Sequence, residues 1–285
     1  MKKTDKSQRR NTKVQYLLQT DSTGLDMEGV VVGKLLTENK LLYDYATVDT
    51  QEMLKIAGPD DVPIGDIPFV TAYLQKIRGI QKENPIELPE YLRMPEFLKR
   101  EYQITTWDKL PVSGVWFVKD VSELKKFGSV VNATYENLAG WFEENPSKYS
   151  TNLVLDKSHL FQVSSVFGIL SEYRVYVIDG EIENICNYNG DCTVLPDIAL
   201  IKKAVGLINA NEKWLRSYTL DIMVGKGGET ALIEVHNFTS VGLYSTLWGQ
   251  NLLRGYKQGI EYLVNDNREL TLPYTNNAKE ERNYE

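Results

Sequence analysis

The sequence predicts an α/β protein, and three features support this prediction. Two segments read as β-hairpins, with turns at Asp179-Gly180 and at Gly225-Lys226-Gly227-Gly228, since such residues supply the positive φ that tight turns need. Apolar residues at helical spacing recur between strand-like runs, for example from Ile198 to Ala210. The length of 285 residues suits one large domain or two modest ones, and 42% hydrophobic with 25% charged residues is ordinary globular composition.

The first hundred residues read as a small α/β unit. Residues 1–13 are basic and almost without apolar side chains, so we expect a solubilising tail, with a nucleic-acid-binding arm as the alternative. Beyond the tail, the pattern predicts strands at Val14–Leu18 and Leu41–Val48 and helices at Met27–Leu36 and Ile67–Ile77, with a loop over Val62–Asp66. We place an N-terminal domain at residues 14–111.

The pattern of predicted elements after Pro111 indicates a second domain. Besides the two hairpins, apolar runs predict strands at Val112–Lys119 and Leu160–Val166. Helical spacing predicts helices at Asn132–Asn145, Ile198–Ala210 and Trp248–Leu263. We place a second domain at residues 112–265, followed by a polar tail at 266–285.

Composition excludes several classes of protein. The net charge of -7 and the pI near 5.2 argue against broad nucleic-acid binding. Cys186 and Cys192 are too few and too close for a disulfide scaffold or a four-ligand zinc site, so we expect a reducing, cytoplasmic setting. With two histidines in the chain, Ser-His-Asp and Cys-His chemistry has little support. No apolar run approaches the ~18 residues of a membrane span, and we expect no membrane partner.

The second hairpin carries an acidic pair. Asp221 lies on its first strand and Glu234 on its second, so we expect the two carboxylates to lie close together. Carboxylate oxygens, completed by phosphates and water, are what Mg²⁺ requires. The alternative is an edge hairpin whose acids are simply solvated.

The acidic pair belongs to a larger set of polar residues at the ends of predicted strands. They are Lys119, Lys125, Glu172, Arg174, Asp221, Glu234, His236 and Asn237. Two lysines and an arginine beside metal-binding groups form a charge pattern suited to a triphosphate with Mg²⁺. Two plainer interpretations stay open: Lys119 extends to solvent from its strand end, and Arg174 pairs with Glu172 or a neighbour. Neither GxxxxGK[ST] nor a GxGxxG after a strand is present.

The order WFVKDVSELKKFG, SEYRVYVIDGEI and YTLDIMV…ALIEVHNFTSVGLY resembles the ATP-grasp superfamily. It is most similar to the phage- and bacteria-borne clade named for one arginine and two lysines. In this resemblance the two lysines fall on Lys119 and Lys125, the Glu-x-Arg strand on Glu172 and Arg174, and the metal-binding acids on Asp221 and Glu234. The implied architecture is an N-terminal α/β domain followed by an ATP-grasp unit of two α+β lobes that hold ATP between their sheets.

The resemblance implies an ATP- and Mg²⁺-dependent carboxylate–amine ligase that works through an acylphosphate. Lys119, Lys125 and Arg174 are expected to stabilise the transferring phosphoryl group. Adenine is expected against the strand Phe161 to Ser165, bonded to backbone near Gln162 and Val163. The expected substrates are a small-molecule or peptide carboxylate and an amine, in the cytoplasm, including that of a phage-infected cell. The sequence does not name either substrate or the oligomeric state.

Two departures from the superfamily pattern keep a second function open. The third metal ligand is typically an asparagine two residues after the glutamate, where this chain has His236; Asn237 beside it is the alternative ligand. Asp120 stands where related proteins often have proline. These residues keep open a catalytically inactive nucleotide-binding or scaffold protein. A nucleic-acid ligase would need a nucleotide-accepting lysine motif, which the sequence lacks.

Overall fold

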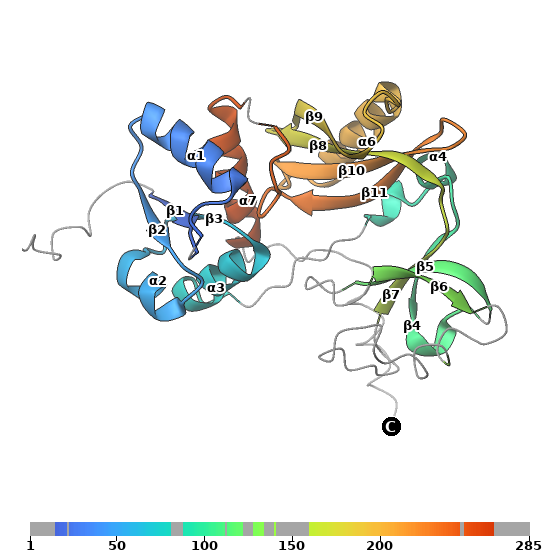
Figure 1. Ribbon diagram of the computed structural model, residues 1–285, viewed down its shortest axis with the longest axis horizontal. Helices are drawn as coiled ribbons and strands as arrows, with labels where there is room; N and C mark the ends of the chain where they lie inside the picture. The colour runs from blue at the N-terminus through green and yellow to red at the C-terminus, as the bar shows by residue number, and fades with distance from the viewer. Residues whose placement is uncertain are drawn as a thin grey trace, which may run out of the picture. The chain divides into compact units, whose positions relative to one another are not determined.

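The chain divides into two compact units (Figure 1). The computed structural model describes residues 15–21, 23–80, 88–111, 113–121, 128–133, 140, 160–245 and 248–264. The first unit comprises residues 1–81 and 238–264, and the second comprises 82–237 and 265–285. The first unit ends at residue 81, ahead of the expected boundary after Pro111, and the last helix of the chain returns to it. The expected tails, 1–13 and 266–285, lie outside the described residues.

The first unit is built on a parallel sheet of three strands in the order β2-β1-β3. The strands are β1 (Tyr16–Gln19), β2 (Tyr43–Ala46) and β3 (Val62–Ile64), and the helices between or after them are α1 (Met27–Glu38), α2 (Thr50–Ile56) and α3 (Ile67–Ile77). The loop predicted over Val62–Asp66 was wrong, because Val62–Ile64 is fully buried and pairs with β1, as continuous apolar runs in parallel sheets do. Each helix begins at an aspartate whose side chain accepts a backbone N–H of the first turn, at Asp26, Asp49 and Asp66.

Helix α7 (Asn251–Val264) completes the first unit, where it contacts β3 and α1. The Tyr256 hydroxyl donates to the buried Glu28 carboxylate of α1. The Tyr256 ring meets that of Phe238 edge-on at 5.4 Å. Gly259 faces the backbone of Phe238 so closely that a Cβ would lie 2.6 Å from its carbonyl carbon. Glycine at this position therefore lets α7 pack directly on the segment that follows the last strand.

The second unit contains an antiparallel sheet of four strands in the order β4-β7-β5-β6. Its strands are β4 (Tyr102–Thr106), β5 (Gly114–Asp120), β6 (Gly128–Ala133) and β7 (Leu160–Ser165). Val118, Val131, Phe161 and Val163 are fully buried. The helix predicted from Asn132 was wrong at its start, since Asn132 and Ala133 extend β6; nearly all of its remainder lies outside the described residues.

A second antiparallel sheet, in the order β11-β10-β8-β9, lies in the same unit. It consists of β8 (Ile169–Ile178), β9 (Glu181–Gly190), β10 (Tyr218–Gly225) and β11 (Thr230–Asn237), and α6 (Ile198–Asn211) lies across one face (Figure 1). Both predicted hairpins are confirmed, with φ of 57° at Asp179 and 80° at Gly180 in the first turn. The second unit also contains the short helices η2 (Glu90–Leu92), α4 (Pro95–Leu98) and η3 (Trp107–Lys109).

The second sheet contains β-bulges that change the register of its hairpins. In β9 the bulged residues are Glu183 and Tyr188, and in β11 the bulged residue is Ile233. Because side chains alternate between faces, one extra residue moves every later side chain of a strand to the other face. Without the bulge at Ile233, the pairing of Val224 with Thr230 would continue to place Glu234 opposite Leu220, on the face away from Asp221.

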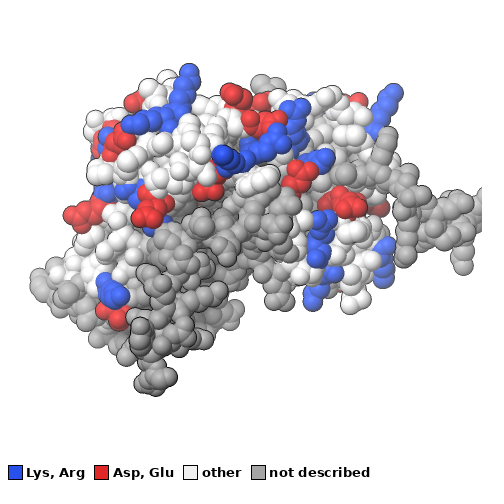
Figure 2. All heavy atoms as spheres, turned by 180° about the vertical axis from the view of Figure 1, so that it is seen from behind, with Lys and Arg blue, Asp and Glu red and all other residues white. Residues whose placement is uncertain are grey.

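The described surface carries charges of both signs. On the face shown in Figure 2, lysine and arginine side chains are interspersed with aspartate and glutamate side chains. Among the described residues, no helix has the length and apolar character needed to cross a membrane.

We predict that Gly259→Ala lowers the free energy of unfolding by about 1–3 kcal/mol, since the new methyl group meets rigid backbone. Gly206→Ala in α6 is the matched control, because no atom lies within 4 Å of its added Cβ; it should be neutral or stabilise by up to about 1 kcal/mol. Urea denaturation of both variants provides the comparison. Equal effects of the two substitutions would show that the Phe238 contact does not constrain α7.

Candidate functional site

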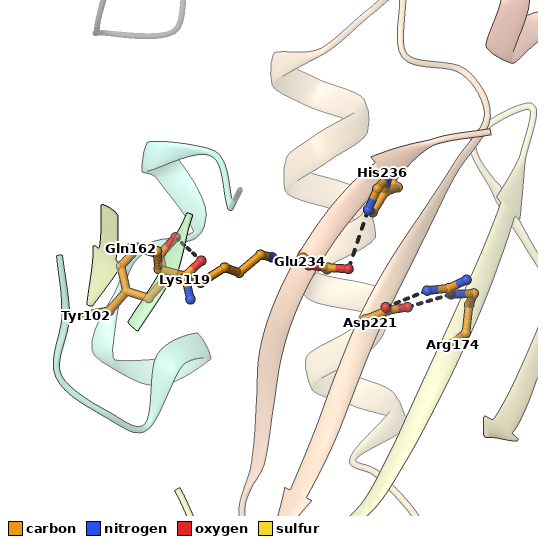
Figure 3. Close-up of polar contacts among 7 residues, drawn as sticks. All are labelled: Tyr102, Lys119, Gln162, Arg174, Asp221, Glu234 and His236. Carbon is orange, nitrogen blue, oxygen red and sulfur yellow. Dashed lines mark hydrogen bonds and ion pairs between the residues drawn. The ribbon is translucent and has the colours of Figure 1, made fainter. Parts of the chain in front are cut away.

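A row of charged side chains crosses the second sheet on the face opposite α6. Asp221 on β10 pairs in register with Arg174 on β8 and with Glu234 on β11. Cross-strand partners share a face, so the three side chains stand side by side (Figure 3). The neighbouring pair, Leu220 and Val235, belongs to the other face, with the core under α6. The predicted proximity of Asp221 and Glu234 is thus confirmed, and it depends on the bulge at Ile233.

Arg174 and Asp221 form a bidentate ion pair. Arg174 Nε donates to Asp221 Oδ1 and Nη2 to Asp221 Oδ2, each at 2.7 Å. The side chains are 13% and 5% exposed. Two parallel charged hydrogen bonds fix the plane of the guanidinium. Asp221 is therefore a close partner of Arg174, in agreement with the plainer sequence interpretation of a cross-strand ion pair to Glu172 or a neighbour.

Lys119 reaches Glu234 from the other sheet of the unit (Figure 3). Its Nζ lies 2.5 Å from Glu234 Oε2, and the two side chains are 11% and 8% exposed. The second oxygen of the carboxylate, Oε1, lies 3.4 Å from His236 Nε2. Lys119 is therefore buried at its strand end and joins β5 to β11, so the plainer interpretation of a lysine that extends to solvent was wrong.

The structure separates His236 from Asn237. His236 pairs with Thr219 and shares the face of Glu234, as the sequence predicted, whereas Asn237 pairs with Tyr218. The Tyr218 hydroxyl approaches the Val205 carbonyl of α6, which marks the opposite face. Asn237 thus belongs to the face opposite the two acids, and its role as the alternative metal ligand stays a prediction.

The first sheet supplies the residues expected at adenine. Gln162 pairs with Lys119 and shares its face, and its Oε1 accepts a hydrogen bond from the Tyr102 hydroxyl at 3.3 Å. Val163 pairs with Val118 in the core. Strand β7 lies between β4 and β5, so both edges of Gln162 and Val163 face neighbouring strands. The expected contact of adenine with the backbone near these two residues stays a prediction.

The remaining predicted residues are placed as follows. Glu172 lies two residues before Arg174 on β8 and shares its face. Asp120 is buried and pairs with Phe161, so it belongs to the face of β5 opposite Lys119; this favours the possibility that its carboxylate points away from the lysine. Lys125 lies outside the described residues.

Sequence reasoning missed two residues that support the site. The ring of Tyr188 lies under the Arg174 guanidinium, 5.7 Å from ring centroid to Cζ. Arg100 donates from Nη1 to the carbonyl oxygens of Leu98 and Leu232 at 2.9 Å each, which ties the segment after α4 to β11. Burial lowers the pKa of Arg100 to about 10, so it stays a cation near neutrality. Neither residue lies at a predicted strand end, where a polar signal is visible.

The acidic pair fits a hard divalent cation in part. Asp221 and Glu234 offer carboxylate oxygens from neighbouring strands, and Mg²⁺ is commonly held by one or two carboxylates with phosphate and water. Over the described parts of the chain, no cluster of three or more His, Cys, Asp or Glu side chains is placed to hold a metal ion. The donors present therefore suit a cation that takes its remaining ligands from a phosphate-bearing substrate.

We predict that Lys119 and Glu234 are strongly coupled in stability. Removing one partner leaves a buried charge uncompensated. The losses in free energy of unfolding caused by Lys119→Met and by Glu234→Leu should therefore add up to more than the loss in the double variant. The expected coupling in a double-mutant cycle is about 1–3 kcal/mol. The exposed pair Lys257 and Glu261, with Nζ and Oε1 3.7 Å apart, is the control and should couple by less than about 1 kcal/mol. Equal coupling in both pairs would contradict the burial argument.

Comparison with known proteins identifies the fold. The family "ATP-grasp domain, R2K clade family 2" matches residues 97–250, more than half of the chain. No curated protein matches it in sequence. D-cycloserine synthetase DcsG is similar in structure, with a TM-score of 0.54 at 11% identity over 87% of this chain and 99% of that one. A D-alanine–D-alanine ligase from Bacillus anthracis gives 0.48 at 14% identity over 88% and 96%. The expected ATP-grasp fold is confirmed, and the chain belongs to the R2K clade family 2 of ATP-grasp domains.

Proposed function

We propose that this chain is an ATP- and Mg²⁺-dependent carboxylate–amine ligase acting in the cytoplasm. The observation that carries the proposal is the pair of buried ion pairs, Arg174 with Asp221 and Lys119 with Glu234, on one face of an ATP-grasp domain. Two cations and two carboxylates drawn from both sheets provide partners for phosphate oxygens and for a divalent cation. Burial strengthens such interactions, because nearby solvent is excluded.

Each residue has a distinct role in the proposal. Lys119 and Arg174 bind phosphate oxygens and stabilise the charge that builds up as the phosphoryl group is transferred, and Lys125 is the third cation. Glu172, on the face of Arg174, orients the polar groups beside it. Asp221 and Glu234 hold the cation, with His236 next to them. When bound, Mg²⁺ withdraws charge from the phosphate oxygens and orients them.

The proposed reaction has two steps. A substrate carboxylate oxygen attacks the γ-phosphorus, the bond to the ADP oxygen breaks, and an acylphosphate forms. An amine then attacks the acyl carbon, inorganic phosphate leaves with the bonding electrons, and the amine nitrogen loses a proton to give an amide. Lys119 and Arg174 act in the first step by binding the oxygens of the group in transit. The acid and the amine are small molecules or peptides.

A second candidate function is nucleotide binding without turnover. Two observations favour it: Asn237 lies on the opposite face of its strand, and His236 occupies the position next to Glu234. A neutral imidazole is a poorer ligand for Mg²⁺ than an amide oxygen. In this version the same cations bind ATP, while the cation is held too weakly for phosphoryl transfer.

Hydroxylamine trapping distinguishes the two functions. An acylphosphate reacts with hydroxylamine to give a hydroxamate, so the chain should form hydroxamate and ADP from ATP, Mg²⁺ and a pool of amino acids and dipeptides. Asp221→Asn should abolish both products, because it removes a carboxylate charge that would hold the cation. Binding of ATP without hydroxamate or ADP from any acid pool would favour the nucleotide-binding candidate; failure to bind ATP would contradict both.

The Lys119–Glu234 pair predicts an unusual response to metal removal. Glu234 competes with phosphate for Lys119, so Glu234→Gln should bind ATP more tightly than the parent chain in EDTA, by about threefold to tenfold. With Mg²⁺ present the order should reverse, because a cation ligand is lost. Titration calorimetry under both conditions measures this. Weaker binding by Glu234→Gln in EDTA would show that Lys119 does not contact phosphate.

His236 predicts the metal preference of the site. Imidazole favours transition metals over Mg²⁺, so the parent chain should bind Mn²⁺ in preference to Mg²⁺, and His236→Asn should shift the preference towards Mg²⁺. Electron paramagnetic resonance of Mn²⁺, with Mg²⁺ as competitor and ATP present, measures the ratio without requiring turnover. His236→Ala is the control for simple loss of the side chain. An unchanged ratio in His236→Asn would exclude His236 as a ligand.

A further inference from the structure

A register shift in β9 brings Tyr188 to the site. Around the Asp179-Gly180 turn, Ile178 pairs with Glu181 and Val177 with Ile182. A regular hairpin would continue this pairing and place Tyr188 opposite Ser171, on the face away from Arg174. The extra residue Glu183 shifts the register by one, and the pairs on either side of Tyr188 are Tyr173 with Asn187 and Glu172 with Asn189. Tyr188 is therefore itself a bulged residue opposite Glu172, on the face of Arg174.

Tyr188 contacts two of the charged residues there. Its ring lies under the Arg174 guanidinium at 5.7 Å, within the range of a cation–π interaction. Its hydroxyl is hydrogen-bonded to the Glu172 carboxylate, and burial, with the negative charges of Asp221 and Glu172, raises the pKa of the phenol. The phenol therefore stays protonated and donates to Glu172 near neutral pH.

These contacts act on opposite charges. The hydroxyl engages Glu172, the carboxylate two residues from Arg174 on the same strand, while the ring supports the guanidinium. Arg174 then directs its Nε and Nη2 edge to Asp221. The ring contact does not depend on that edge, so the guanidinium keeps its place when another anion takes the position of the aspartate.

We propose that Tyr188 is a positioning residue for nucleotide binding: its ring holds the Arg174 guanidinium in the row while phosphate oxygens replace Asp221 as its partner. This inference rests on the proposed function, since it requires Arg174 to bind phosphate. It also gives the bulge at Glu183 a role, because this bulge brings an aromatic ring to a face from which regular pairing would exclude it.

The test is the dissociation constant of ATP with Mg²⁺, measured on the full chain by equilibrium dialysis. Tyr188→Leu should weaken binding by about tenfold, and Tyr188→Phe, which keeps the ring, should stay within about threefold of the parent. In an Arg174→Met background, Tyr188→Leu should cause no further loss. Tyr173→Phe is the matched control: its hydroxyl donates to the Cys192 and Val194 carbonyls at 3.1 Å each on the other face, so it should lower stability without changing ATP affinity.

The outcomes separate this inference from the proposed function. Parent-like affinity in Tyr188→Leu, or an equal loss in the Arg174→Met background, would overturn the positioning role while leaving nucleotide binding intact. Failure of the parent chain to bind ATP would overturn the proposed function and, with it, this inference. Circular dichroism checks folding; should Tyr188→Leu fail to fold, Tyr188→Met provides the same removal of the ring with a more adaptable side chain.

Discussion

The ion pair between Lys119 and Glu234 is the interaction on which the site depends. It joins β5 to the face of the neighbouring antiparallel sheet that carries Asp221 and Arg174, and both side chains are at least 89% buried. Burying two charges costs desolvation free energy, which is offset only when the two charges are closely paired. The pair therefore keeps both side chains directed at one point. In the proposed complex, phosphate oxygens would take the place of Glu234 beside Lys119, and a cation would take the place of Lys119 beside Glu234.

Bulges determine which side chains reach that point. The extra residue Ile233 puts Glu234 on the face of Asp221, and the extra residue Glu183 puts Tyr188 on the face of Arg174. In each hairpin, a bulge between the turn and the functional side chain keeps that side chain from facing α6. Bulges of this kind disrupt the hydrogen-bond ladder locally. Here they gather on one face a row of charged side chains that a regular sheet with this sequence would divide between its two faces.

This reliance on register explains what the sequence could and could not predict. Periodicity located α1, α3, α6 and both hairpins, because amphipathic spacing and turn residues are local signals. It missed β3, since three buried residues do not establish a period, and it could not detect the bulges, which depend on pairing between strands. The proximity of Asp221 and Glu234 was inferred correctly from the hairpin, although a regular hairpin would have separated them. The face on which Asn237 lies and the pairing of the backbone at Val163 could not be read from the sequence for the same reason: the face and the edge of a strand are properties of the sheet.

The most direct test of the account is the affinity of Lys119→Met for ATP in the presence of Mg²⁺, measured by titration calorimetry beside the parent chain. If Lys119 exchanges Glu234 for phosphate, the parent should bind one ATP per chain. The variant should lose about 10- to 150-fold in affinity, as expected for a charged hydrogen bond, while keeping its circular dichroism spectrum. Equal affinity in two folded proteins would contradict the account, because the lysine would then serve only to join the sheets.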